Sequence, residues 1–82
     1  MKSMFEKATT FNQPIGSWDT RKVTNMSDMF HQASTFNQNI SKWNVDKVKD
    51  DPNNYKNFGK ASPLCHKGNN LMPNGFGNEA CS

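Results

Sequence analysis

Two cysteines and two histidines are the side chains in this sequence that could support redox or metal chemistry. Cys65 and Cys81 are the only cysteines, and His66 directly follows the first of them. A disulfide between Cys65 and Cys81 would close a loop of about 15 residues and stabilise the fold by roughly 3 kcal/mol, because it lowers the chain entropy of the unfolded state. The alternative is a pair of free thiols in a disordered tail.

Metal binding and catalysis by these residues are less favoured. The candidate ligands are Cys65, His66, Cys81 and His31, but adjacent Cys and His residues lack the two-residue spacing with which paired ligands share one zinc ion. Nucleophilic catalysis needs a thiol with a positioned base and an orienting group, and the sequence offers no third member. We therefore expect no catalytic residue, no metal site and no cofactor, and a protein that is not an enzyme.

A basic segment with interleaved aromatic residues could contact nucleic acid. Tyr55 and Phe58 could stack on bases. The lysines around them are Lys47, Lys49, Lys56, Lys60 and Lys67. Aspartates interrupt this segment and the net charge is only +3, so a solvated basic face is favoured, and nucleic-acid binding through the Lys-rich C-terminal part is the alternative function.

Two short motifs fit the N-glycosylation sequon, one beginning at Asn25 and one at Asn39. So short a pattern occurs often by chance in a chain whose commonest residue is Asn. Asn25 is also a candidate helix cap, so a glycan on it would compete with packing.

Length and composition limit the elements that could position these residues. A chain of 82 residues forms at most one small domain, which buries about 60–65% of the surface that its unfolded form exposes. No apolar run exceeds two residues, whereas a membrane span needs about 20 and a signal-peptide core about 7–15. From these residues we therefore expect neither a membrane span nor a signal peptide.

The first fifty residues consist of two copies of one 25-residue unit. Residues 1–25 laid over residues 26–50 give 12 identities in 25 positions without a gap. The identities include both tryptophans, both isoleucines and two pairs of phenylalanines. The copies therefore share one fold, and their register is secure.

The apolar spacing within a unit predicts one short helix and one short strand. Apolar residues stand at i, i+3, i+4 and i+7 in the second copy, namely at Met26, Met29, Phe30 and Ala33, which is the spacing of one helix face. Downstream, Trp43 and Val45 keep the two-residue alternation of a strand. Stacking of the copies about 4.8 Å apart would place Trp18 near Trp43 and Phe11 near Phe36.

This arrangement predicts a core drawn from both copies. Its members are Phe5, Phe11, Ile15, Trp18, Val23, Met26, Met29, Phe30, Ala33, Phe36, Ile40, Trp43, Val45 and Val48.

The repeated string resembles a known family. Met-Phe-x-x-Ala-x-x-Phe-Asn-Gln-x-Ile-x-x-Trp-x-x-x-x-Val-Thr-Asn-Met runs from Met4 to Met26 and again, without its ending, from Met29 to Val48. It is similar to the BspA-like leucine-rich repeat of bacterial, mycoplasmal and protist surface proteins. The resemblance implies a parallel strand on each repeat, a secreted or cell-surface location, and a role in adhesion without enzymatic activity. Because three or more repeats are usually needed for stability, we expect a fragment of a longer array, a truncated gene product or a degenerate relative.

The C-terminal part departs from the repeat. The 25-residue register puts Asp51, Asn54, Tyr55, Phe58 and Ala61 at the positions of Met26, Met29, Phe30, Ala33 and Phe36. Residues 51–61 therefore read as a degenerate capping turn, and residues 62–82 as an irregular tail that could be disordered.

The sequence thus predicts an α/β repeat fold, a short leucine-rich-repeat-like solenoid of two coils, residues 1–25 and 26–50, with a capping turn and a tail. We expect a surface interaction or adhesion module for an unknown protein or cell-surface ligand, able to self-associate through exposed strand edges. The polar residues expected to contact the partner are Ser17, Asp19, Arg21, Lys42, Asn44 and Asp46.

Overall fold

A four-residue turn recurs along the chain in the computed structural model, which describes residues 1–66, 68 and 70–81. In each turn the backbone N–H of the fourth residue donates to the carbonyl of the first. The second copy begins with two such turns, in which Met29 N donates to Met26 O at 3.2 Å and Ala33 N donates to Phe30 O at 3.0 Å. The apolar residues therefore stand at the ends of the turns, where the chain faces the interior.

The predicted α/β solenoid is wrong, because the described residues contain neither an α-helix nor a β-strand. Their helical elements are three short 3₁₀ turns, η1 (Pro52–Asn54), η2 (Pro63–Cys65) and η3 (Asn78–Ala80). The expected helix fails at Asp28 and Gln32, whose φ angles of 57° and 62° lie in the left-handed region that a right-handed helix excludes. The expected strand is also a turn, since Trp43 N donates to Ile40 O at 3.1 Å.

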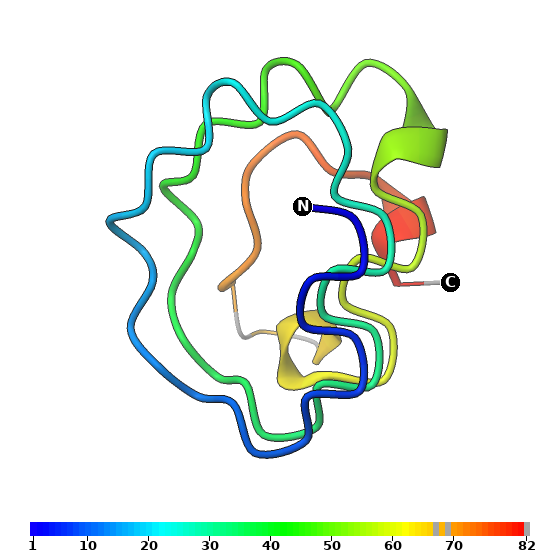
Figure 1. Cartoon of the computed structure of the whole chain (residues 1–82). Coiled ribbons are helices and arrows are strands. Elements are labelled where there is room, and N and C mark those ends of the chain that lie inside the picture. Colours follow the sequence, from blue (N-terminus) through cyan, green and yellow to red (C-terminus); the bar gives the residue numbers. More distant parts are fainter. Residues whose placement is uncertain (67, 69, 82) are drawn as a thin grey trace.

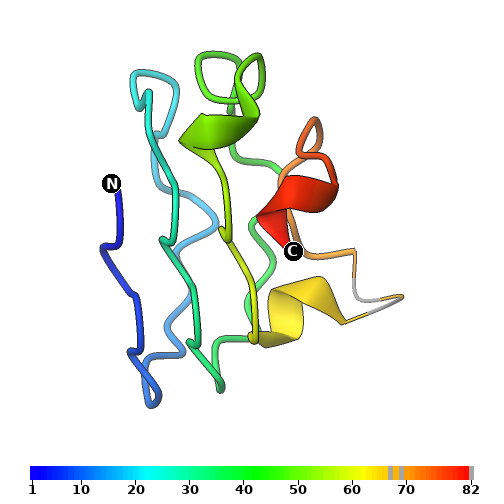
Figure 2. The ribbon, with the colours of Figure 1, turned by 90° about the vertical axis from the view of Figure 1, so that its right-hand side faces the viewer.

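The two copies lie side by side and are joined by a ladder of backbone hydrogen bonds. Ser3 N donates to Ser27 O at 2.9 Å, and Phe5 N to Met29 O at 2.9 Å. In Figure 1 the two copies trace similar outlines, and Figure 2 shows their first halves running next to each other. The copies are close enough that a Cβ added at Gly16 would lie 2.5 Å from the carbonyl oxygen of Asn39, so this position requires glycine.

Equivalent aromatic rings of the two copies stack on each other. Phe5 stacks on Phe30 with ring centroids 5.3 Å apart, and Phe11 on Phe36 at 5.7 Å. Trp18 and Trp43 are also parallel, with an interplanar angle of 7° and centroids 6.4 Å apart. Each such pair contributes about 0.5–1.5 kcal/mol beyond the burial of its area.

A third segment continues the ladder, but in a register four residues later than the one predicted. The amides of Ser3 and Phe5 donate to carbonyls 24 residues ahead, whereas Met26 and Phe30 donate to Asn54 and Phe58, 28 residues ahead. The turn η1 accommodates the four additional residues. The expected equivalence of Tyr55 with Phe30 is therefore wrong.

Glycine replaces the phenylalanine in this register. In the shifted register the turn that begins at Gly59 corresponds to the turn that begins at Phe30. Gly59 therefore takes the position of Phe30, and it is buried. A Cβ at Gly59 would meet Cys65 Sγ and Leu64 Cβ, both at 3.1 Å. Leu64 and the cystine thus occupy the space that an aromatic ring fills in the first two copies.

The tail covers the third segment and closes that end of the molecule. Gly59 N donates to Ala80 O at 2.8 Å, Phe76 stacks on Tyr55 with centroids 4.5 Å apart, and a disulfide joins Cys65 to Cys81. The result is a small compact globule with extents of 28 × 26 × 24 Å, stabilised by the disulfide. Within the described chain, no helix has the length and apolar character to span a bilayer.

The core is formed mainly by the second copy and the third segment. Of the predicted core residues, those buried are Ile15, Met26, Met29, Phe30, Ala33, Phe36, Ile40, Trp43, Val45 and Val48. Phe5, Phe11 and Val23 are half-buried. The prediction is wrong for Trp18, which is 38% exposed, because no residue that the structure describes covers the outer face of the first copy.

The two tryptophans provide a matched test of this packing. Trp43 is 4% exposed and its Nε1–H donates to Ile15 O at 3.0 Å, so we expect Trp43→Ala to cost about 3–5 kcal/mol of unfolding free energy. Trp18→Ala removes a ring that is exposed on one side and should cost much less. Thermal unfolding followed by circular dichroism measures both, and equal losses would contradict the placement of the two rings.

Glycine substitutions test the left-handed residue of a turn in the third segment. Ala61 adopts φ 62°, a conformation that costs a residue with a side chain about 1–2 kcal/mol and glycine almost nothing. We therefore expect Ala61→Gly to keep or raise the melting temperature. Lys60→Gly, at the exposed neighbouring position without positive φ, is the control and should lower stability by about 0.5–1 kcal/mol. A larger loss at Ala61 than at Lys60 would contradict the turn.

Candidate functional site

All six polar residues predicted to contact a partner are exposed; they are Ser17, Asp19, Arg21, Lys42, Asn44 and Asp46. The two sets of three lie on adjacent copies, and Thr20 Oγ1 bridges them by donating to Asn44 O at 3.0 Å. Several of these side chains already have intramolecular partners. Asp19 pairs with Arg21 at 3.2 Å, and Asp46 pairs with Lys49 at 3.3 Å.

The two sequons are turn caps in the structure. Asn25 Oδ1 accepts hydrogen bonds from both the amide and the hydroxyl of Ser27, each at 2.9 Å. Asn39 Oδ1 accepts the same pair from Ser41, at 3.0 and 2.6 Å. An Asn side chain that bonds to the backbone two residues ahead forms an Asx-turn. This turn accounts for the Asn-x-Ser spacing without a glycan.

The basic segment does not present aromatic rings for base stacking. Tyr55 is 4% exposed and Phe58 is fully buried, and both rings contact Phe76. Of the lysines in this segment, Lys47, Lys49, Lys56 and Lys60 are exposed. Lys67 lies outside the described residues.

The cysteines cannot act as metal ligands or nucleophiles in this structure, because both are held in the disulfide. His66 is exposed beside them. A shallow hollow lies here, lined by His66, Leu71, Met72, Cys81 and neighbouring residues. Among its lining residues, His66 is the only one with an ionisable side chain.

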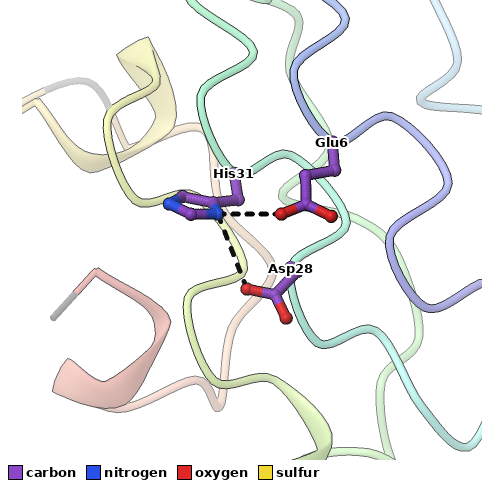
Figure 3. Close-up of side chains that lie close together, drawn as sticks. All are labelled: Glu6, Asp28 and His31. Carbon is purple, nitrogen blue, oxygen red and sulfur yellow. Dashed lines mark hydrogen bonds and ion pairs between the residues drawn. The ribbon is translucent and has the colours of Figure 1, made fainter.

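A histidine and two carboxylates meet at the junction of the two copies. His31 Nδ1 lies 3.1 Å from Glu6 Oε2 and 3.7 Å from Asp28 Oδ1. Figure 3 shows both carboxylates directed toward the same ring nitrogen. The three side chains are half-buried, with exposed fractions of 33% for Glu6, 29% for Asp28 and 20% for His31. We call this group the Glu6–Asp28–His31 cluster.

The turns and the ladder position this cluster. Asp28 is the third residue of one turn and His31 the second residue of the next, so both project from the same side of the second copy. Glu6 comes from the first copy, which is fixed at this point because Lys7 N donates to His31 O at 2.8 Å. The three ligand atoms all lie within 4.8 Å of one another. Among the described residues this is the group of His, Cys, Asp and Glu side chains with the geometry to hold a metal ion.

Sequence reasoning missed this cluster. Glu6 and His31 occupy the same position of the repeat, so stacking of the copies was enough to bring them together. Asp28 could not be placed, because a helix and a turn direct its side chain differently. His31 was considered only with the cysteines and His66, which the structure does not bring to it.

The outer side of the first copy remains open. The carbonyls of Ser27, Met29 and His31 each accept an amide from the first copy. Their counterparts in the first copy, the carbonyls of Lys2 and Met4 and Glu6, accept no hydrogen bond from the residues that the structure describes. Apolar side chains of the same copy are also exposed, since Met4 is 52% and Trp18 38% exposed. We call these carbonyls, with the side chains of Met4, Phe5, Phe11 and Trp18, the open face.

Comparison with known proteins identifies the family. No curated protein and no solved structure matches this chain. The family model described as "Mycoplasma protein of unknown function, DUF285" matches residues 1–68. The match covers both copies and the third segment through η2. Because it spans well over half of the chain, the protein belongs to the DUF285 family.

Proposed function

We propose that this chain is a non-enzymatic interaction module and part of a longer array of the same repeat, in which the open face binds another copy of the unit. The open face is the observation that supports this proposal. It combines backbone acceptors that have no partner among the described residues with partly exposed aromatic rings, and the first two copies are joined by these two features.

The direction of the backbone hydrogen bonds restricts what can bind there. In the described chain, the first copy donates its amides to the second, and the second donates to the third segment. The open face therefore offers carbonyls alone. Two open faces cannot pair with each other, since acceptors would meet acceptors. The complementary surface is one that presents amides at the spacing of Ser3, Phe5 and Lys7, and another copy of the repeat carries these.

The apolar part of the open face matches the same occupant. Phe5, Phe11 and Trp18 stack on Phe30, Phe36 and Trp43 of the second copy, and Phe5 also stacks on Phe11 with centroids 4.2 Å apart. A preceding copy would carry equivalent rings at the same positions and would cover the exposed part of Trp18. Exposed apolar surface of this kind marks interaction sites.

The motif likeness to BspA-like proteins supports a surface role. Such proteins resemble this chain in the repeated Met-Phe, Phe-Asn-Gln and Ile-x-x-Trp elements, and the DUF285 match fits a mycoplasmal repeat protein. We accordingly place the module in a secreted or cell-surface array. The leucine-rich-repeat form of the likeness is withdrawn, because the described residues contain no strand.

That the six exposed polar residues of the two copies contact a partner stays a prediction. Arg21 and Lys42 are the cationic side chains among them. Nucleic-acid binding through the C-terminal lysines has less support, because the burial of Tyr55 and Phe58 removes the stacking platform that such sites use.

Adding a repeat tests the proposal. A further copy of residues 1–25, fused ahead of Met1, should raise the melting temperature, because it buries the open face. The emission of Trp18 should shift to shorter wavelength as its free side is covered. Differential scanning calorimetry measures the first effect. Fluorescence measures the second in a Trp43→Phe background whose added copy carries Phe in place of its own tryptophan, so that the emission comes from Trp18 alone.

The matched control carries Phe5→Ser, Phe11→Ser and Trp18→Ser in the added copy alone. It has the same length and the same backbone donors, but it cannot extend the aromatic stacks. We expect little gain in stability from the control. If the unaltered copy gives no more than the control, the open face does not bind the repeat, and the proposed array is wrong.

A further inference from the structure

We propose that the Glu6–Asp28–His31 cluster is a binding site for a divalent transition-metal ion, with zinc as the representative ion. The site would bridge the two copies, since Glu6 belongs to the first and the other two ligands to the second. This inference goes beyond the proposed interaction function and does not depend on it.

The donor atoms suit such an ion in type and spacing. Zinc binds histidine nitrogen and carboxylate oxygen at about 2.0–2.2 Å, and tetrahedral geometry then separates neighbouring ligand atoms by about 3.3 Å. The distances from His31 Nδ1 to Glu6 Oε2 and Asp28 Oδ1 are 3.1 and 3.7 Å, on either side of that value. Small side-chain movements therefore suffice to place three ligands around one ion.

Charge and chemistry favour the same class of ion. Two carboxylates within 4.8 Å of each other repel, and a divalent cation between them removes that repulsion. The imidazole nitrogen discriminates against Mg²⁺ and Ca²⁺, which prefer all-oxygen sites. The half-buried position leaves room for water to complete the coordination.

The backbone holds the ligands in place before an ion binds. Lys7 N donates to His31 O, and Asp28 N donates to Lys56 O at 3.0 Å. The ladder thus joins the two copies that carry the ligands, and it joins the second copy to the third segment. A bound ion adds a link between the first and second copies, so it should stabilise the junction.

Titration of the whole disulfide-bonded chain with zinc chloride tests the site. We expect one ion per chain by isothermal titration calorimetry, and a rise in melting temperature of about 5 °C or more at saturation. Cobalt(II) chloride should give visible absorption bands of a site with fewer than six ligands. Magnesium chloride should produce neither effect.

Variants assign the site to the cluster. His31→Gln should weaken zinc binding by more than about 100-fold, and Glu6→Gln by more than about 10-fold. Loss of a residue that supports a ligand already weakens metal binding by about 10–100-fold, and loss of a direct ligand weakens it at least as much. His66→Gln is the matched control, because His66 is the other histidine and is exposed; it should leave the affinity unchanged.

A measurement on the unmodified chain covers the case in which His31→Gln does not fold. On zinc addition, the ring signals of His31 should shift in NMR spectra while those of His66 stay in place. The proposal is overturned by absence of saturable binding below about 1 mM, by shifts at His66 instead, or by equal affinity of Glu6→Gln and the unmodified chain.

Discussion

The backbone hydrogen bonds between neighbouring copies run in one direction, and the rest of the structure depends on that polarity. Buried amides must be paired, and here the amides that form the ladder, such as those of Phe5 and Phe30, find their acceptors in the segment that follows. The final acceptors are Glu79 and Ala80 in the tail. The ladder therefore has a closed end, sealed by the tail and the disulfide, and an open end that presents carbonyls at the first copy.

The turns explain how so few apolar residues form a core. In the second copy each turn places its first and fourth residues toward the interior, so Met26, Met29, Phe30 and Ala33 are all buried. The required left-handed residues are supplied by Ser3, Lys7, Asp28, Gln32, Asn57 and Ala61, and each is the third residue of its turn. Most are not residues that favour this conformation. The ring stacks and the ladder supply the energy that holds them there.

The candidate site arises where the copies differ. At most core positions the copies carry the same residue and stack like on like, as Phe5 does on Phe30. At one surface position they carry Glu6 and His31 instead, and stacking turns that difference into a contact of 3.1 Å. A repeat protein can thus acquire a site by changing one position in one copy, without altering the fold.

The sequence by itself determined the 25-residue register, the pairing of like rings and much of the core, because identical residues at a fixed period must occupy equivalent places. The choice between helix and turns depended on the sign of φ at Asp28 and Gln32, which residue spacing does not encode: i, i+3, i+4 and i+7 describe a helix face and two successive turns equally well. The shifted register of the third segment followed from the four residues accommodated at η1. The Glu6–Asp28–His31 cluster depends on both the stacking of the copies and the turns, since only stacked turns bring side chains from two copies to one point.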